Sequence, residues 1–365
     1  MSCPAVGVGV ERLLDVSDLT VRFDGFQGVV HAVEGVEFDI SSREVVGLIG
    51  ETGCGKSVTG FSLVRLIQPP GRVVRGRVLL RGRDLLTLSE RELRRVRGRD
   101  VAMIFQRPMS SLNPVFDIET QLLEIIQLHR VRRRTAARRI AIESLAAVAL
   151  PDPQDILKKR PFELSGGMQQ RVMIALALAC NSALLIADEP TTALDVSIQL
   201  QILKLIRGIV DERGMSVLLI SHDMSVIGSM CDRINVMYAG SIVEAGDQRT
   251  IIRHAAHPYS QALLRAVPEG NATQGVRLVA IDGTVPSLIT PPPGCRFAPR
   301  CSEATDVCTT APPPRVQVSP AHSARCFHIA EPAAGSGTEG RCVQDTEKRN
   351  SRNPNRKEME CSTKG

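Results

Sequence analysis

The stretch EVVGLIGETGCGKS, residues 44–57, decides the fold of this chain. Its first half is a short apolar run that ends in glycine, which is typical of a strand buried in a parallel sheet. Helical spacing then runs from Lys56 to Ile67, where the sequence PPG at residues 69–71 ends it. The second half fits G-x-x-x-x-G-K-S between a strand and a helix, which is the setting that this pattern requires.

Such a loop binds phosphate, because its glycines let backbone N–H groups curl around an anion at the positive end of a helix. We expect Lys56 to reach the β- and γ-phosphates of a nucleotide and the Ser57 hydroxyl to bind Mg²⁺. The predicted nucleotide-binding residues are Gly50, Glu51, Thr52, Gly53, Cys54, Gly55, Lys56 and Ser57.

A second apolar strand, LLIADE at residues 184–189, ends in two acids. Its position predicts that Asp188 holds the Mg²⁺ shell. Glu189, one residue further, is placed to polarise an attacking water as a general base. Two solvated acids after a strand would be unremarkable alone, but beside the phosphate loop they favour nucleotide hydrolysis.

The string LSGGMQQR, residues 164–171, is the most informative in the chain. Ser-Gly-Gly at a helix start offers a hydroxyl and bare backbone donors at a positive dipole end, which makes a second phosphate site. One chain cannot easily fold two such sites around the same γ-phosphate. We therefore expect a head-to-tail dimer, with ATP between the loop of one subunit and this segment of the other.

Together these strings resemble the ATP-binding-cassette (ABC) ATPases over about residues 13–264. The resemblance implies site roles for the following residues: Ser165, Gly166, Gly167 and Gln169 as the signature on the partner's ATP, Gln106 as a catalytic and Mg²⁺-binding glutamine, Glu189 and His222 as further catalytic residues, Asp195 as the D-loop acid, and Phe23 as the ring that stacks on adenine. An ordinary core phenylalanine explains Phe23 nearly as well.

The resemblance also implies the fold class, an α/β P-loop NTPase of ABC type. Apolar runs predict strands at 44–50, 100–106, 183–188 and 216–221, and helical stretches are predicted at 118–150 and 254–267. Ser89 and Glu92 predict a capping box at the start of a short Arg-rich helix. Strands that alternate with helices already indicate a parallel sheet covered on both faces. The family adds to this RecA-like core an antiparallel β subdomain and an inserted helical subdomain at about residues 107–163. We expect the ATPase domain at 13–264, a small Cys/Pro-rich extension at 265–330, and a disordered tail at 331–365.

Finer matches at residues 103–114, 191–196, 236–240 and 257–264 resemble the ATPase subunits of oligopeptide and dipeptide importers. In that branch two homologous ATPases lie under two transmembrane permeases, at the cytoplasmic face of the membrane, and an external solute-binding protein delivers the cargo. The chain departs from the branch at Arg107, where an acid is usual, and at Cys54, where serine is common. The alternative is an ABC ATPase that drives transport of nickel or another solute, or that drives an exporter.

The charge of the chain is uneven. Residues 72–99 contain ten arginines and three acids, and residues 130–139 contain six arginines and no acid, although the net charge is only +6. Only 3% of the residues are aromatic, which argues against a nucleic-acid surface built on stacked bases. We expect the arginines to face solvent, lipid headgroups or the permease, with no nucleic-acid partner.

Four cysteines follow the ATPase domain, with 5, 6 and 17 residues between them: Cys295, Cys301, Cys308 and Cys326. No signal peptide or convincing membrane span is visible, and in a reducing compartment clustered thiols favour a metal over disulfides. Some peptide-importer ATPases that resemble this chain carry a [4Fe–4S] cluster. Iron–sulfur, zinc and unmetallated thiols all stay open.

Overall fold

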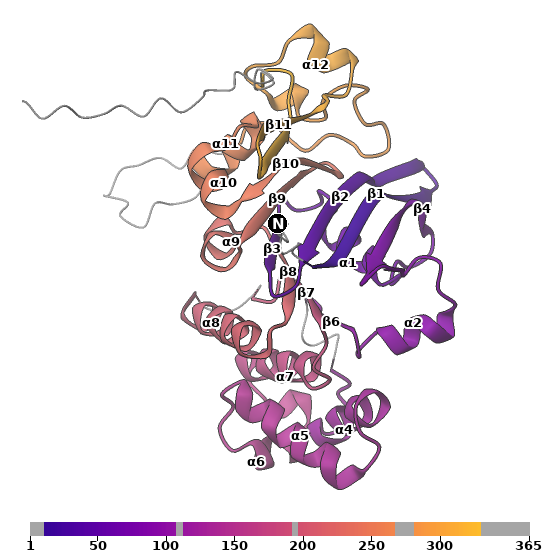
Figure 1. Ribbon diagram of the computed structural model, residues 1–365, viewed down its shortest axis with the longest axis vertical. Coiled ribbons are helices and arrows are strands. Elements are labelled where there is room, and N and C mark those ends of the chain that lie inside the picture. Colours follow the sequence, from indigo (N-terminus) through magenta and orange to yellow (C-terminus); the bar gives the residue numbers. More distant parts are fainter. Residues whose placement is uncertain (1–10, 107–111, 192–195, 267–280, 330–365) are drawn as a thin grey trace, which may run out of the picture. The chain divides into compact units, whose positions relative to one another are not determined.

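The computed structural model describes residues 11–106, 112–191, 196–266 and 281–329. They belong to one compact unit, Met1–Glu331, which holds two β-sheets and the helices that pack on them. Figure 1 shows the larger sheet at the centre of this unit with the smaller sheet beside it. No helix in these ranges is long and apolar enough to cross a bilayer.

The larger sheet has eight strands in the order β11-β12-β10-β9-β3-β8-β7-β6. The five strands from β9 to β6 are parallel, and β10, β12 and β11 continue the sheet antiparallel. The parallel strands are β3 (Val45–Ile49), β6 (Val101–Ile104), β7 (Leu184–Asp188), β8 (Ser216–Ser221) and β9 (Arg233–Tyr238). The predicted strands at 44–50, 100–106, 183–188 and 216–221 are confirmed.

Every residue of β3, β7 and β8 is buried, because helices cover one face of the parallel sheet and the smaller sheet with the helix at 56–63 covers the other. Burial of one Leu or Ile side chain contributes roughly 1.5–3 kcal/mol, so these strands form the most stable part of the core. The carboxyl ends of β3, β6, β7 and β8 meet at one edge of the sheet. Residues that follow these four strands in the sequence therefore lie close together.

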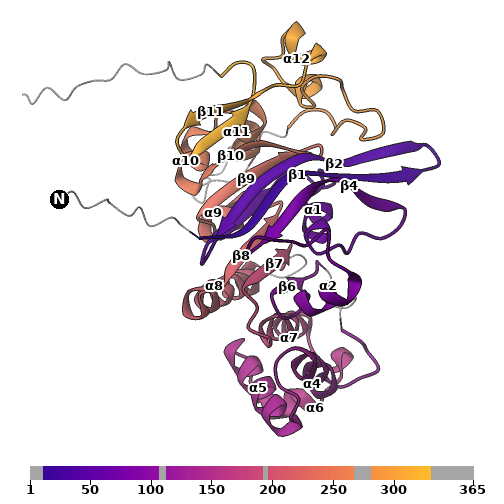
Figure 2. The same cartoon turned by 45° about the vertical axis from the view of Figure 1, so that its right-hand side comes forward.

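The smaller sheet is antiparallel and has the order β2-β1-β4-β5. Its strands are β1 (Arg12–Gly25), β2 (Gly28–Ser41), β4 (Gly71–Leu80) and β5 (Arg83–Asp84), and Figure 2 shows the long β1–β2 hairpin. Arg72 and Arg75 of β4 form exposed ion pairs with Asp24 and Asp18 of β1. Part of the arginine-rich segment is thus balanced locally by acids of the neighbouring strand.

Three helices beyond the carboxyl edge of the larger sheet form the inserted helical subdomain: α4 (Ile118–His129), α5 (Arg134–Ala147) and α6 (Pro153–Lys158). The sequence predicted one helical stretch at 118–150. The structure breaks it after α4, where the backbone of Arg130 leaves the helical region. Residues 107–111, including Arg107, lie outside the described residues.

Six further helices pack on the larger sheet: α1 (Lys56–Leu63), α7 (Gly166–Leu178), α8 (Val196–Arg213), α9 (Met224–Met230), α10 (Gln248–His254) and α11 (Pro258–Arg265). α1 stops four residues before the predicted Ile67. The predicted helix at 254–267 is divided, because Pro258 begins α11 as a separate helix. α2 (Glu90–Val96) has the predicted capping box of Ser89 and Glu92.

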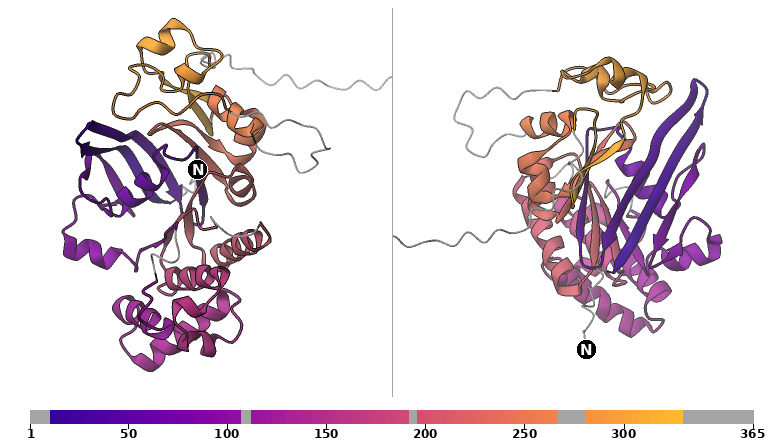
Figure 3. Two further views of the ribbon diagram at one scale, coloured as in Figure 1. Left: turned by 180° about the vertical axis from the view of Figure 1, so that it is seen from behind. Right: turned by 45° about the horizontal axis from the view of Figure 1, so that its top comes forward.

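Residues 281–329 form a C-terminal extension that joins the larger sheet, as Figure 3 shows. It contains η2 (Ala298–Arg300), α12 (Asp306–Thr310), β11 (Arg315–Ser319) and β12 (His322–Arg325). β12 pairs with β10 (Ser241–Asp247), which extends the sheet by a hairpin that the sequence did not predict. The predicted boundary between residues 264 and 265 stays a prediction, and the predicted tail at 331–365 lies outside the described residues.

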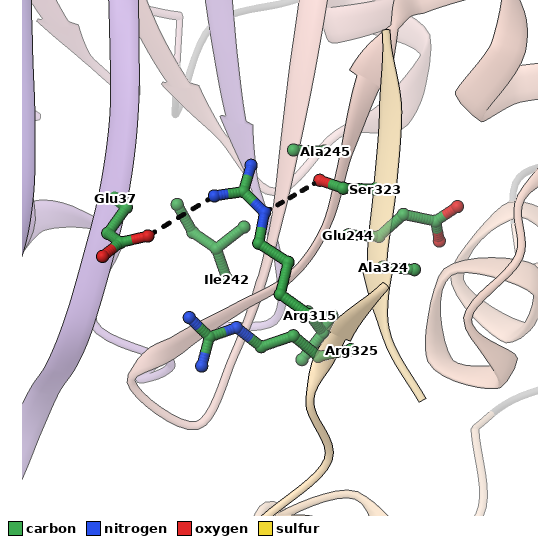
Figure 4. Close-up of a pocket in the computed structure, with 9 residues that line it drawn as sticks. Glu37, Ile242, Glu244, Ala245, Arg315, Ser323, Ala324 and Arg325 are labelled. Atoms are coloured by element: carbon green, nitrogen blue, oxygen red, sulfur yellow. Dashed lines mark hydrogen bonds and ion pairs between the residues drawn. The ribbon is translucent and has the colours of Figure 1, made fainter. Parts of the chain in front are cut away.

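Two acidic side chains, the buried Glu244 and Glu37 of β2, hold the β11–β12 hairpin in place. Glu244 of β10 is 1% exposed, accepts a hydrogen bond from the backbone N–H of His257 at 3.0 Å, and lies 2.6 Å from the His322 ring. On the other side of the hairpin, Arg315 reaches Glu37 of β2 at 3.4 Å (Figure 4). The extension therefore contacts both sheets.

Candidate active site

The predicted nucleotide-binding loop lies between the buried strand β3 and α1. Gly53 and Gly55 have φ values of +82° and +104°, a region that side chains rarely adopt. Gly50 lets the loop backbone lie close to the backbone of Met237 in β9, because a Cβ at position 50 would lie 2.1 Å from the Met237 carbonyl oxygen. Each glycine is thus needed for the tight path of the loop around its own N–H groups.

Lys56 begins α1 and folds back over the loop. Its Nζ donates to the carbonyl oxygens of Gly50 at 2.7 Å and of Glu51 at 3.0 Å, and the side chain is 5% exposed. Its third partner is the Cys54 thiol, with Sγ at 4.0 Å. A buried ammonium that is held by uncharged groups can exchange those partners for a phosphate. Cys54 lies behind it, fully buried, and burial raises the pKa of its thiol. At neutral pH Cys54 is therefore a neutral packing residue of the loop.

Ser57 and Asp188 meet at the carboxyl ends of β3 and β7. The Ser57 hydroxyl donates to Asp188 Oδ1 at 3.0 Å, and Asp188 is 1% exposed. Burial raises the pKa of Asp188 to about 6, against the lowering effect of the Ser57 hydrogen bond. A buried carboxylate beside a hydroxyl is a donor set that fits Mg²⁺, because oxygen ligands suit this ion and its charge replaces the solvation that burial removes.

Glu189 lies at the meeting point of three neighbouring strands. Gln106, after β6, donates from Nε2 to Glu189 Oε2 at 2.7 Å. His222, after β8, places Nδ1 at 3.0 Å from Glu189 Oε1. The structure therefore brings together the three residues that the sequence predicts as catalytic. The contact of Gln106 is with Glu189, and its predicted role as a Mg²⁺ ligand stays a prediction.

The backbone of Glu189 is unusual for a side chain of its size. Its φ is +46°, and its N–H donates to the Ile220 carbonyl of β8 at 2.9 Å. This left-handed turn directs the carboxylate toward Gln106 and His222 instead of along the strand. Such a backbone conformation costs free energy of folding, and residues with strained backbones are concentrated at functional sites.

The predicted signature segment caps α7. The Ser165 hydroxyl accepts a hydrogen bond from the Met168 N–H at 3.4 Å, and Ser165 and Gly166 are exposed while Gly167 is partly buried. Gln169 is buried, and its Nε2 donates to the carbonyls of Pro161 and Leu164. The amide of Gln169 thus shapes the turn before Ser165. Its predicted contact with the partner's ATP stays a prediction.

Gln170 is a residue of this segment to which the sequence reasoning gave no role. It is 2% exposed, and its Nε2 donates to the carbonyl oxygen of Pro190, directly after Glu189. Its Oε1 is buried without a hydrogen-bond partner among the described residues. The side chain therefore connects the signature helix to the segment that carries the predicted general base.

Phe23 is partly buried on β1, and its ring lies against Gly71 of β4 and the adjoining core. A Cβ on Gly71 would lie 2.4 Å from the ring, so the two positions fit closely. This packing explains Phe23 structurally, and its role on adenine stays a prediction. Phe26, at the tip of the β1–β2 hairpin, is fully exposed. Asp195 lies outside the described residues.

The structure brings the four cysteines of the extension into one neighbourhood. Cys295 donates its N–H to the Cys308 carbonyl at 2.7 Å. Burial raises the pKa of the Cys326 thiol, and the charges of the other three cysteines raise it further. In the part of the chain that is described, no group of three or more His, Cys, Asp or Glu side chains is positioned to hold a metal ion. The predicted metal role of the four thiols stays a prediction.

Two further residues contact the nucleotide-binding loop. Tyr259 of α11 accepts the backbone N–H of Glu51 on its hydroxyl at 2.9 Å, and Arg300 of the extension binds the Glu51 carboxylate through two hydrogen bonds. Neither contact could be predicted from the sequence. The separations are 208 and 249 residues, and no local pattern marks either residue as a neighbour of the loop.

Known proteins carry the same combination of parts. Residues 33–192 match the ABC transporter family, and residues 243–308 match the oligopeptide/dipeptide transporter C-terminal region. The chain is 47% identical to a probable peptide ABC transporter ATP-binding protein, y4tR, of Sinorhizobium fredii, over 88% of this chain and 96% of the relative. It is 44% identical to the dipeptide transport ATP-binding protein DppD of Bacillus subtilis, over 87% and 95%.

Solved structures agree with the fold. The dimeric post-hydrolysis state of the ATP-binding cassette MJ0796, bound to ADP and Pi, superposes with a TM-score of 0.59 at 26% identity and covers 65% of this chain and 99% of that one. The matched part is an α/β ATPase cassette with a parallel and an antiparallel sheet, as predicted. The chain belongs to the ATP-hydrolysing subunits of ABC transporters, in the branch that carries the oligopeptide/dipeptide transporter C-terminal region.

Proposed function

We propose that this chain binds and hydrolyses ATP to power an ABC importer of peptides across the cytoplasmic membrane. One observation carries the catalytic part: the carboxylate of Glu189 is held between Gln106 and His222. The peptide cargo is supported by the C-terminal region at residues 243–308 and by relatives whose names describe dipeptide or peptide transport.

The residues divide the reaction among them. The N–H groups of the loop and the Lys56 ammonium bind the β- and γ-phosphates, and Ser57 and Asp188 hold Mg²⁺, which neutralises charge on the phosphates when bound. Glu189 accepts a proton from the attacking water as it turns toward the γ-phosphorus. His222 is about half exposed on the same edge of the sheet, where it can contact the γ-phosphate.

A second ATPase subunit completes the site. Ser165 and Gly166 are exposed at the start of α7, while the nucleotide-binding loop lies at the end of β3 in the same chain. An exposed Ser-Gly pair at the N-terminus of a 13-residue helix suits a phosphate supplied from another molecule. We propose that a homologous subunit, arranged head to tail, places its signature on the ATP of this chain and receives this signature on its own.

The permeases dock beside the glutamine after β6. A cleft of about 250 Å³ lies there between β6, α4 and α7, and apolar side chains of Met103, Phe105, Ile125 and Met173 line it. An apolar cleft of this kind accepts a short helix of a partner. Because Phe105 precedes Gln106, a helix in the cleft is coupled to the catalytic carboxylate. We propose that this contact holds the chain at the cytoplasmic face of the membrane, under two permeases fed by a solute-binding protein.

Uptake of labelled dipeptides and oligopeptides by cells that lack this chain tests the proposal. We expect the wild-type chain to restore uptake and Ser165→Arg to leave it at background, because the larger charged side chain blocks the partner's phosphate site. Ser229→Arg, an exposed serine on α9 away from the signature, is the matched control. Restored uptake with Ser165→Arg would refute the shared site. Restored uptake of nickel or export of a solute, without peptide uptake, would refute the cargo.

We propose further that Cys295, Cys301, Cys308 and Cys326 hold a [4Fe–4S] cluster, with zinc as the alternative metal. Four thiols that influence one another electrostatically suit either, since a bound metal displaces the thiol protons. We expect equal amounts of iron and acid-labile sulfide in anaerobically purified protein. Cys301→Ser should lose both, and Cys180→Ser, a buried cysteine outside the group, should keep them. Stoichiometric zinc without iron would refute the cluster, and no metal would refute both.

A further inference from the structure

Glu51, the second residue of the nucleotide-binding loop, is held at three separate points. Its N–H donates to the Tyr259 hydroxyl at 2.9 Å, and its carbonyl accepts from Lys56 Nζ at 3.0 Å. Its carboxylate binds Arg300 at 2.7 and 3.1 Å. Two of these three contacts come from residues that follow the larger sheet's last parallel strand. The path of the loop therefore depends on groups far outside the loop sequence.

All three guanidinium nitrogens of Arg300 donate hydrogen bonds. Besides the two bonds to Glu51, it donates to the carbonyls of Asp282 at 2.7 Å and Ile281 at 3.0 Å, and to the Tyr238 hydroxyl at 3.3 Å. Its side chain is 4% exposed. The Glu51 side chain is 25% exposed, so the pair is partly open to solvent. An Arg–carboxylate pair with two parallel hydrogen bonds fixes orientation as well as distance. Arg300 thus holds Glu51 in one geometry.

Aromatic side chains pack around the Arg300 side of this pair. Tyr238 packs against Tyr259 and Phe297 with ring centroids 4.5 and 5.2 Å apart, and Arg300 lies over the Tyr238 ring. In such a setting electrostatic interactions are screened less than in water. An unpaired Glu51 carboxylate would therefore repel a polyphosphate bound to the same loop.

We propose that Arg300 is a positioning residue for the nucleotide: from the C-terminal extension it fixes Glu51 and cancels its charge, so that the loop is preformed for the phosphates of ATP. Arg300 itself touches no phosphate in this assignment. The inference rests on the proposed ATP site, and it gives the extension a direct part in ATP binding. An anchor that served only to attach the extension would have no effect on the affinity for ATP in folded protein.

The test is steady-state hydrolysis of MgATP by the full chain, with ADP affinity measured by calorimetry. We expect Arg300→Ala to raise KM for ATP and Kd for ADP about tenfold, which corresponds to about 1.4 kcal/mol. The turnover number at saturating ATP should change less than roughly threefold, because a loop that binds ground and transition states alike affects KM and not kcat. Arg300→Lys keeps the positive charge but loses the paired hydrogen bonds, so its KM for ATP should lie between the values of wild type and Arg300→Ala.

A second substitution separates the charge effect from loss of the fold. In Arg300→Ala/Glu51→Gln the unpaired carboxylate is gone, so KM should return to within about threefold of Glu51→Gln alone, in the non-additive manner of residues in contact. If Arg300→Ala does not fold, Arg300→Lys and Glu51→Gln still report the interaction. Multiplied effects in the double variant would show that Arg300 acts elsewhere and would overturn the proposal.

The matched control is Arg233→Ala. Arg233 pairs with Glu44 through two hydrogen bonds of 2.5 and 3.2 Å, directly before β3, whereas Glu51 follows the same strand. Arg233→Ala should lower the melting temperature but leave KM for ATP within about twofold of wild type. If Lys56→Ala loses ATP affinity and Arg300→Ala keeps the wild-type KM, the inference fails alone. If Lys56→Ala also binds ATP normally, the proposed ATP site fails.

Discussion

Lys56→Ala is expected to lower the affinity of the chain for ATP by roughly 30-fold or more. The ammonium is 5% exposed and is held by uncharged groups, the carbonyls of Gly50 and Glu51 and the Cys54 thiol, so its charge is available to a phosphate that enters the loop. Loss of one partner of a buried charged contact costs about 2–5 kcal/mol, and every 1.4 kcal/mol is about tenfold in affinity. Calorimetry with ATP and ADP measures the effect.

The control for this substitution is Lys158→Ala, which removes an exposed ammonium at the end of α6. It should bind ATP as the wild type does. Melting temperatures of both variants establish that they are folded. Wild-type ATP affinity in folded Lys56→Ala would contradict the assignment of residues 50–57 as the phosphate loop.

Glu189→Gln is expected to lower ATP turnover by at least ~10²-fold, the lower range for loss of a general base, while ATP still binds. Glutamine keeps the shape of the side chain but cannot take a proton from water. The neighbours Gln106 and His222 stay in place, and the phosphate loop is untouched. The effect therefore falls on kcat, in contrast to the effect of Lys56→Ala on binding and of Arg300→Ala on KM.

Those features of the site that come from local patterns could be predicted from the sequence. A strand, a glycine-rich turn and a helix start are adjacent in the chain, so residues 44–57 predicted both the loop and its place in the sheet. The ends of β6, β7 and β8 follow from parallel topology, and this brought Gln106, Glu189 and His222 together as expected. The capping box could also be predicted, because its two partners, Ser89 and Glu92, lie within one helical turn.

The role of the extension could not be predicted in the same way. β11 and β12 have five and four residues, too few for a periodic signal among the prolines. Arg300 and Tyr259 reach Glu51 across more than 200 residues, and only tertiary packing sets such contacts. Gln169 is a further example: its place in the signature predicts a contact with the partner's ATP, which stays a prediction, and the two hydrogen bonds of its Nε2 to carbonyls of its own chain could not be read from the sequence. Sequence motifs therefore identify candidate residues, whereas tertiary packing determines which hydrogen-bond partner each side chain has.

Phosphate release by the purified full chain tests the central claim, that ATP is hydrolysed at Glu189, most directly. Turnover and ATP affinity are measured together for wild type, Glu189→Gln and Glu143→Gln, the last an exposed glutamate on α5 that serves as the control. The account predicts at least ~10²-fold slower turnover in Glu189→Gln with ATP affinity retained, and wild-type values in Glu143→Gln. Turnover in Glu189→Gln within a few-fold of wild type would contradict it.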